Sequence, residues 1–212
     1  MKLEPLKLCA LALCMVALGG TLTACAPFIL GGAAASALVA TDRRTSGAQL
    51  EDEGIELRAA GRIRESLGDR AHVNVTSYNR QALITGEVPN AQDKQQVEQI
   101  VSRVENVRAI VNELAVLGNT SLTQRSSDAL TTAKVKAAMV DAKDIYANAF
   151  KVVTERGTTY LMGRVTQREA TRATDITRST GGVQKVVRVF EIITEEDLQR
   201  TLPQAPPAKP TS

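Results

Sequence analysis

The sequence predicts an α+β fold built from two copies of one helix–strand–strand–helix–strand unit. Three observations predict it. The same order of helical and strand patterns occurs twice, apolar positions of one copy match apolar positions of the other, and each predicted hairpin has a glycine at a matched site, Gly86 and Gly163. A regular repeat indicates that each copy is one structural unit. We expect the two structural glycines to serve the backbone, at a bulge or where a helix comes close, and not to bind a ligand.

The chain begins with a pattern typical of a secretory signal peptide. A basic start precedes a short apolar stretch, residues 8–18, which is too short to cross a bilayer as a helix. The following Leu22-Thr23-Ala24-Cys25 resembles the lipobox of bacterial lipoproteins. It implies a signal peptide over residues 1–24 and acylation of Cys25 as the first mature residue. An ordinary signal peptide with an incidental cysteine is the alternative. Ala26 stands where an acidic residue would favour the inner membrane, which resembles outer-membrane sorting.

The composition of the chain argues against several classes of function. The formal net charge is +3, no basic block occurs, and aromatic residues are only 3% without any Trp, which argues against nucleic-acid binding. The other two cysteines lie in the signal peptide, so no disulfide is expected in the mature chain. His72 is the only histidine; we expect it to be a surface or turn residue. No metal site, cofactor or enzymatic activity is predicted.

The first copy is predicted over residues 48–116, after a lipidated N-terminus and tether over residues 25–47. Its first helix, 52–67, has an apolar residue at every fourth position. Alternating apolar and polar residues then predict a β-hairpin over 73–88. Asn90 is a suitable cap for a second helix, and β-branched residues over 107–114 predict a third strand.

The second copy is predicted over residues 126–195, with Ser126-Ser127-Asp128 as a helix cap. A helix over 127–142 is followed by a hairpin over 150–165. The capping-box pattern Thr166-Gln167-Arg168-Glu169 opens the next helix, and the last strand covers 183–193.

The two copies can be aligned residue by residue. The hairpins match at an offset of 77 residues, and the second helices and last strands match at 76. The first helices match at 72, which would leave five extra residues in the loop before the second hairpin. Residues 117–125 are predicted to be a linker. The tail, 196–212, contains an acidic start to a short helix and a proline-rich end that should be disordered.

Two such units, a glycine in each hairpin and a lipobox cysteine together resemble the BON domain family. The residues that carry the resemblance are Asp42 to Asp52, Ser126-Ser127-Asp128, Thr131-Thr132, Lys134-Val135-Lys136, Tyr160-Leu161-Met162-Gly163, Val165-Thr166 and Arg168-Glu169-Ala170. The resemblance implies two tandem BON domains, each αββαβ, with a three-stranded mixed sheet packed against two helices. It also implies a periplasm-facing, lipid-anchored protein of the outer membrane that supports membrane integrity. The expected partners are anionic phospholipid, bound through the first helix of the second domain, and the outer-membrane assembly machinery. Recruitment to division sites is expected as well.

That helix has two apolar sides, although packing on one sheet needs only one. Val135 and Met139 lie on the first side, which we expect to face the core. The second side, with lysines on its flanks, is suited to an anionic membrane surface. The predicted phospholipid-binding residues are Leu130, Ala133, Lys134, Lys136, Ala137 and Val140.

At an offset of 72, Leu130, Ala137 and Val140 match Arg58, Glu65 and Gly68, so the second copy has apolar residues where the first has charges. The second copy alone, 124–200, is therefore expected to bind anionic vesicles, and the first alone, 48–116, is not. The alternative for this side is packing against the first domain. The alternative function is a protein-interaction adaptor for outer-membrane protein assembly or cell-wall machinery.

Overall fold

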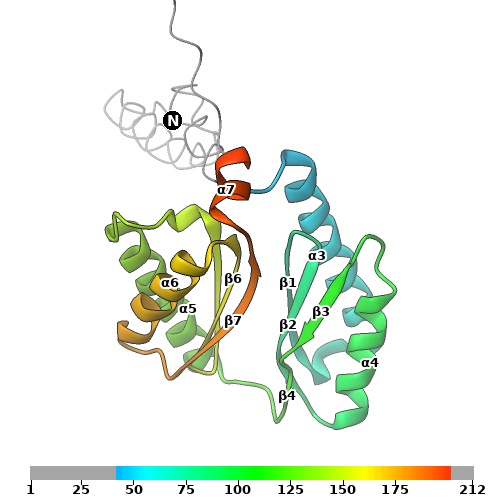
Figure 1. The fold of residues 1–212 in the computed structure, drawn as a ribbon. Coiled ribbons are helices and arrows are strands. Elements are labelled where there is room, and N and C mark those ends of the chain that lie inside the picture. Colours follow the sequence, from blue (N-terminus) through cyan, green and yellow to red (C-terminus); the bar gives the residue numbers. More distant parts are fainter. Residues whose placement is uncertain (1–41, 202–212) are drawn as a thin grey trace, which may run out of the picture. The chain divides into compact units, whose positions relative to one another are not determined.

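The computed structural model describes residues 42–201 (Figure 1). The predicted signal peptide, Cys25 and the proline-rich end of the chain lie outside these residues. The described residues all belong to one compact unit, whose boundary lies between residues 36 and 37, and the three hydrophobic clusters of the described part of the chain lie within it. None of its described helices is both long enough and apolar enough to cross a membrane.

The first repeat contains two helices on one side of a mixed sheet (Figure 1). Its elements are α3 (Ser46–Leu67), a 3-10 turn (Gly68–Arg70), β1 (His72–Tyr78), β2 (Gln81–Val88), α4 (Ala91–Ser102), β3 (Ala109–Asn112) and β4 (Ala115–Val116). Strand β1 is antiparallel to β2, whereas β3 and β4 are both parallel to it. The predicted third strand is therefore divided in two. The side-chain oxygen of Asn112 accepts from the Leu114 N–H at 3.2 Å, a local bond that competes with strand pairing.

The second repeat has the same order and a continuous third strand. Its elements are α5 (Leu122–Asp141), a 3-10 turn (Ala147–Ala149), β5 (Phe150–Glu155), β6 (Thr158–Val165), α6 (Gln167–Ser179) and β7 (Lys185–Ile192), followed by a short helix, α7 (Glu195–Thr201). Thr166 and Glu169 form the predicted capping box. The α+β class and the tandem repeat are thus confirmed.

Strand pairing confirms the predicted register of the hairpins. Val73 pairs with Gly86 in the first repeat, and Phe150 pairs with Gly163 in the second. Both positions differ by 77 residues between the repeats. A Cβ atom at Gly86, where φ is +112°, would lie 2.0 Å from the His72 carbonyl oxygen, and one at Gly163 would lie 2.5 Å from the Ala149 carbonyl oxygen. The close neighbour of Gly86 is the first residue of its paired strand, β1, whereas that of Gly163 is the last residue of the 3-10 turn that precedes β5.

The predicted register of the first helices is wrong by one turn. In the first repeat, the backbone N–H groups of Asn79 and Arg80 donate to the carboxylate of Asp52, both at 2.7 Å. In the second, Arg156 and Gly157 donate in the same way to Asp128, at 2.8 and 2.9 Å. All four donors have positive φ, as in the tight turns that match the twist of a β-hairpin.

The two aspartates are therefore equivalent, at an offset of 76. A stripe of buried residues follows each aspartate along its helix. It contains Ile55, Ala59 and Ile63 in α3 and Thr131, Val135 and Met139 in α5. A buried residue recurs every four positions in both helices, so a shift of one turn still places Val135 and Met139 on apolar residues of α3. Periodicity alone could not reveal the error, and the loop before the second hairpin has one extra residue, not five.

Both first helices begin earlier than predicted. The Thr45 side chain caps α3 by accepting from the Ala48 N–H at 3.1 Å, so the helix includes residues assigned to the tether. Ser121 caps α5 in the same way, through the Gln124 N–H at 3.2 Å. The predicted cap at residues 126–128 lies inside this helix, because the Asp128 carboxylate binds the hairpin turn and not the helix end. The non-helical connection between the repeats is reduced to residues 117–121.

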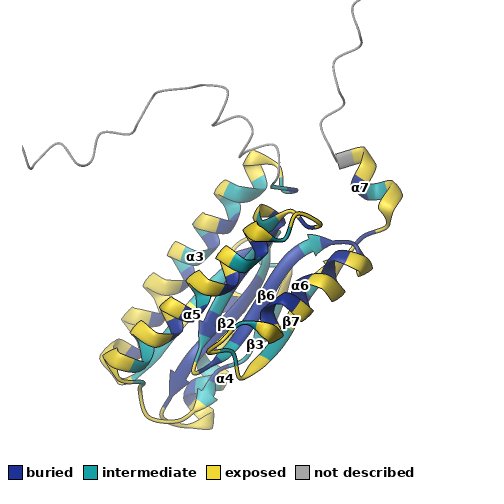
Figure 2. Ribbon diagram, turned by 90° about the vertical axis from the view of Figure 1, so that its left-hand side faces the viewer, coloured by how far each residue is buried: buried dark blue, intermediate teal, exposed yellow. Residues whose placement is uncertain are grey.

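Each repeat has its own core between its helices and one face of its sheet. The other faces contribute to a third cluster that contains side chains from both repeats, Tyr78, Leu83, Tyr160, Met162 and Val189. Strands β2 and β6 are consequently buried on both faces, as Figure 2 shows by their dark blue colour.

Candidate functional site

The outward side of α5 presents the apolar residues that the sequence placed there. Leu130 and Val140 are 64% and 68% exposed. Ala133, Ala137, Lys134 and Lys136 are exposed as well, while the opposite side of the helix carries the buried stripe. The helix therefore separates a core-facing side from an unpartnered apolar side (Figure 2).

Two further residues extend this surface beyond the prediction. Leu122, 78% exposed, and the exposed Ala129 lie on the same side of α5. Leu122 was missed because the helix was expected to begin at residue 127; its distance of eight residues from Leu130 was the signal that could have found it. We define the α5 face as Leu122, Ala129, Leu130, Ala133, Ala137 and Val140, with Lys134 and Lys136 at its edges.

Packing of the α5 face against the first domain, the alternative considered above, is wrong for this structure. Side chains of the sheets form the apolar contact between the repeats, and the α5 face remains exposed. A hollow of about 500 Å³ borders its C-terminal end, lined by Lys136, Met139, Val140 and Phe150 together with Asp42 and Gln49.

The corrected register changes the comparison with α3. The equivalents of Leu130, Ala137 and Val140 are Gly54, Gly61 and Arg64, so only one charge is replaced by an apolar residue. The outward side of α3 also carries two exposed leucines, Leu50 and Leu57, at 70% and 75%. Charge is what distinguishes the helices: α3 has five acidic residues and three arginines, whereas α5 has three basic and two acidic residues.

A second group of residues connects the start of the described chain to both repeats. Arg43 is buried and donates to both carboxylate oxygens of Glu169, at 2.7 and 2.6 Å, and to the Arg164 carbonyl oxygen at 3.0 Å. Burial alone would raise the pKa of Glu169, but the bonds from Arg43 and Thr166 lower it below its ordinary value. The sequence predicts a tether at this position, but Arg43 fixes the segment to the second repeat.

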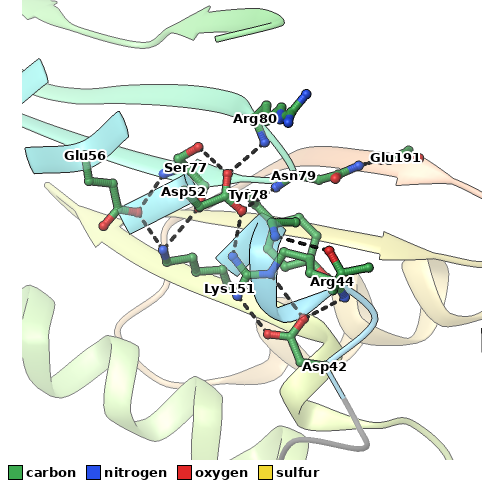
Figure 3. A network of polar contacts seen from close by, with 12 residues as sticks. Asp42, Arg44, Asp52, Glu56, Ser77, Tyr78, Asn79, Arg80, Lys151 and Glu191 are labelled. Carbon is green, nitrogen blue, oxygen red and sulfur yellow. Dashed lines mark hydrogen bonds and ion pairs between the residues drawn. The ribbon is translucent and has the colours of Figure 1, made fainter. Parts of the chain in front are cut away.

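The next residue fixes the same segment to the first repeat (Figure 3). Arg44 donates to Asp52 at 2.8 Å and lies over the Tyr78 ring, 4.4 Å from its centroid. Burial raises the pKa of Asp52, but hydrogen bonds from Ser77, the Arg80 N–H and Arg44 outweigh this effect and lower it. We call residues 42–45 the clamp segment, because its arginines contact both repeats.

Polar contacts also join the repeats directly. Lys151 Nζ donates to Glu56 Oε1 at 2.6 Å, and the Asn79 amide donates to Glu191 at the same distance (Figure 3). His72, expected to be a surface or turn residue where a strand opens, is the first residue of β1, but its side chain is only 17% exposed and bonds the buried Glu87. The hairpin register, which places His72 opposite Glu87, was the signal that could have revealed this pair.

Comparisons with known proteins agree with the fold. The BON domain family matches residues 52–118 and 127–194. The outer membrane lipoprotein DolP of Haemophilus influenzae is 37% identical over 197 residues, which cover 91% of this chain and 100% of that protein. A 21 kDa hemolysin of Actinobacillus pleuropneumoniae is 29% identical over 154 residues, covering 72% of this chain and 79% of the relative.

Among solved structures, a type III secretion protein of Chlamydia trachomatis, CdsD, aligns over 69% of this chain and 98% of its own, with 11% identity and a TM-score of 0.28.

Proposed function

Because the chain belongs to the BON domain family and resembles an outer-membrane lipoprotein over most of its length, we propose that it is a non-catalytic, lipid-binding lipoprotein of the outer membrane. Cys25 carries the acyl anchor and holds the two BON domains on the periplasmic side. The α5 face binds anionic phospholipid. The observation that carries the proposal is an exposed apolar helix surface, about twenty residues long, with lysines at both edges.

The chemistry of this surface suits the boundary between lipid headgroups and acyl chains. Full burial of a leucine or valine side chain stabilises binding by about 1.5–3 kcal/mol, and Leu130 and Val140 are each about two-thirds exposed before binding. Lys134 and Lys136 add attraction to negatively charged headgroups. No large basic cluster is needed, because the acyl anchor already holds the protein at the membrane and a second, weak contact suffices.

The rest of the proposal follows from the preference for anionic lipid. Membrane regions enriched in such lipid, including division sites, would concentrate the protein, and contacts with the outer-membrane assembly machinery would act there. Support for outer-membrane integrity is the expected cellular consequence.

A vesicle-flotation experiment with residues 37–212 tests the α5 face. Binding is compared between vesicles of phosphatidylcholine alone and vesicles that also contain phosphatidylglycerol. The parent should float with the anionic vesicles, and Leu130→Glu should abolish this. Leu57→Glu is the matched control, because Leu57 is an exposed leucine, at 75% against 64% for Leu130, on the outward side of the first helix of the other repeat. Loss of binding in both variants, or in neither, would contradict the assignment.

A protein-interaction adaptor is the second candidate, favoured by the exposed Leu50 and Leu57 on α3. The adaptor predicts crosslinks to proteins of the assembly or cell-wall machinery that survive Leu130→Glu and are lost in Leu57→Glu. The flotation experiment therefore tests the outward side of α5, and the crosslinking experiment tests the outward side of α3.

A further inference from the structure

Three side chains of metal-binding type meet where the two repeats approach each other. His72 and Glu87 are paired residues of β1 and β2, and Glu155 is the last residue of β5. One potential ligand atom from each residue lies within 4.8 Å of the other two. Because the three residues come from three strands of two repeats, the fold and not a local sequence motif brings them together.

One oxygen of the Glu87 carboxylate is buried without a hydrogen bond. Its side chain is fully buried, and its Oε2 atom accepts from His72 Nδ1 at 3.1 Å and from the Thr120 N–H and hydroxyl at 3.3 and 3.1 Å. The other oxygen, Oε1, is buried and accepts no hydrogen bond. The Arg156 guanidinium is 3.8 Å from it, which is too far for a hydrogen bond. Buried carboxylate oxygens are normally satisfied, so this atom requires an explanation.

The remaining contacts hold the other two residues in place around it. The Asn74 amide donates to Glu155 Oε1 at 2.6 Å and lies 3.4 Å from His72 Nε2. Partners of this kind orient metal-binding side chains in proteins, where the ring nitrogen that does not bind the metal keeps its hydrogen bond.

We propose that His72, Glu87 and Glu155 form a binding site for one divalent first-row transition-metal ion, with Zn²⁺ as the probe. One imidazole nitrogen and two carboxylate oxygens are ligands that Zn²⁺ accepts, and three protein ligands leave a coordination position for water. Ca²⁺ takes six to eight oxygen ligands, and this cluster offers a nitrogen and few oxygens. Since Glu155 belongs to the second repeat, the bound ion joins the two repeats.

Arg156 is the internal competitor for the same carboxylate. Its side chain is 43% exposed, so it can turn into solvent when the ion binds. This gives the site a signature that a merely structural polar network lacks. Removing the Arg156 charge should strengthen Zn²⁺ binding, whereas removing a ligand should weaken it.

The test is calorimetric and spectroscopic titration of Zn²⁺ into residues 37–212, prepared without a histidine tag and with chelator removed. Because His72 is the only histidine of the chain, its imidazole NMR signals report the site without ambiguity. We expect one ion per chain, a shift of these signals at saturation, at least tenfold weaker binding in Glu155→Gln and severalfold tighter binding in Arg156→Gln. Glu196→Gln, which removes an exposed acidic residue of α7, should leave the affinity unchanged.

Glu155→Gln is the main variant because Glu155 lies near the surface and its amide replacement keeps the size of the side chain; circular dichroism checks that it folds. His72→Gln and Glu87→Gln repeat the test where they fold. Absence of stoichiometric binding by the parent, imidazole signals that do not respond to Zn²⁺, or equal affinity in Glu155→Gln would each overturn the proposal.

Discussion

The ion pair between Arg43 and Glu169 should be one of the strongest single contributions to the stability of this protein. Both side chains are almost fully buried, at 4% and 1% exposure, and two short hydrogen bonds join them. In Arg43→Met the apolar part of the side chain is kept, but a buried carboxylate loses its charged partner. Breaking a buried pair in this way costs about 3–5 kcal/mol.

Urea unfolding of residues 37–212 measures this loss as a lower midpoint with an unchanged slope. Arg178→Met, which removes an exposed arginine in the last turn of α6, is the control and should change the unfolding free energy by less than about 0.5 kcal/mol. The double variant Arg43→Met/Glu169→Gln should recover part of the loss, because glutamine can still complete the capping box with Thr166 and no unpaired charge stays buried.

Two results would refute this reasoning. A loss below about 1 kcal/mol in Arg43→Met would place the pair in the range of solvent-exposed ion pairs. A double variant no more stable than Arg43→Met would show that the unpaired carboxylate is not the source of the cost.

Three further predictions concern backbone, pH and salt. Gly86→Ala should lower the free energy of unfolding of residues 37–212 by about 3 kcal/mol or prevent folding, because the new Cβ meets a strand carbonyl and φ is positive. Thermal unfolding measures this loss. In the control Gly61→Ala the new Cβ meets no neighbouring atom within 4 Å, so this variant should raise the free energy of unfolding by about 0.5–1 kcal/mol. Folding lowers the pKa values of Asp52 and Glu169, so the stability that these carboxylates contribute is complete above the ordinary carboxyl range and is lost as the pH falls below about 4. Urea midpoints measured from pH 7 to pH 2 should therefore drop in that window. Asp52→Asn should flatten the drop, and an unchanged pH profile in this variant would contradict the assignment. Flotation with anionic vesicles should weaken partly with added salt, because the lysine attraction is screened and burial of the apolar side chains is not; complete loss would mean that charge alone binds.

Features set by local chemistry could be predicted from the sequence. The hairpin register, the capping box at Thr166 and the two apolar sides of α5 each depend on residues close together in the chain, and the structure has all three. The offset between the first helices could not be predicted, because a four-residue period fits equally well after a shift of one turn. Asp52 and Asp128 resolve the shift only through hydrogen bonds to turns more than twenty residues away.

Long-range contacts explain the rest of what the sequence did not show. The clamp segment looked like part of a polar tether, because the partner of Arg43 lies 126 residues further along the chain. The two-sided burial of β2 and β6 depends on a second sheet, which no pattern within one strand can indicate. The exposure of the α5 face was predictable, whereas its extension to Leu122 required the true helix start, which Ser121 caps.

Under the proposed acylation of Cys25, the clamp segment has a consequence for membrane binding that can be tested in the lipid-anchored chain. Between Cys25 and Asp42 lie sixteen residues, which span at most about 55 Å when fully extended. An acyl anchor at Cys25 therefore confines the α5 face to a thin layer next to the membrane, where its effective concentration reaches the millimolar range and a weak contact is occupied. Leu130→Glu should then leave the protein in the membrane fraction but expose α5 to water. An environment-sensitive fluorophore attached to a cysteine introduced at Ala137 should report this as a red-shifted emission relative to the parent, while Leu57→Glu should not change it. Equal emission in all three proteins would show that the anchor alone contacts the membrane, and release of Leu130→Glu from the membrane fraction would show that the anchor does not hold the protein by itself.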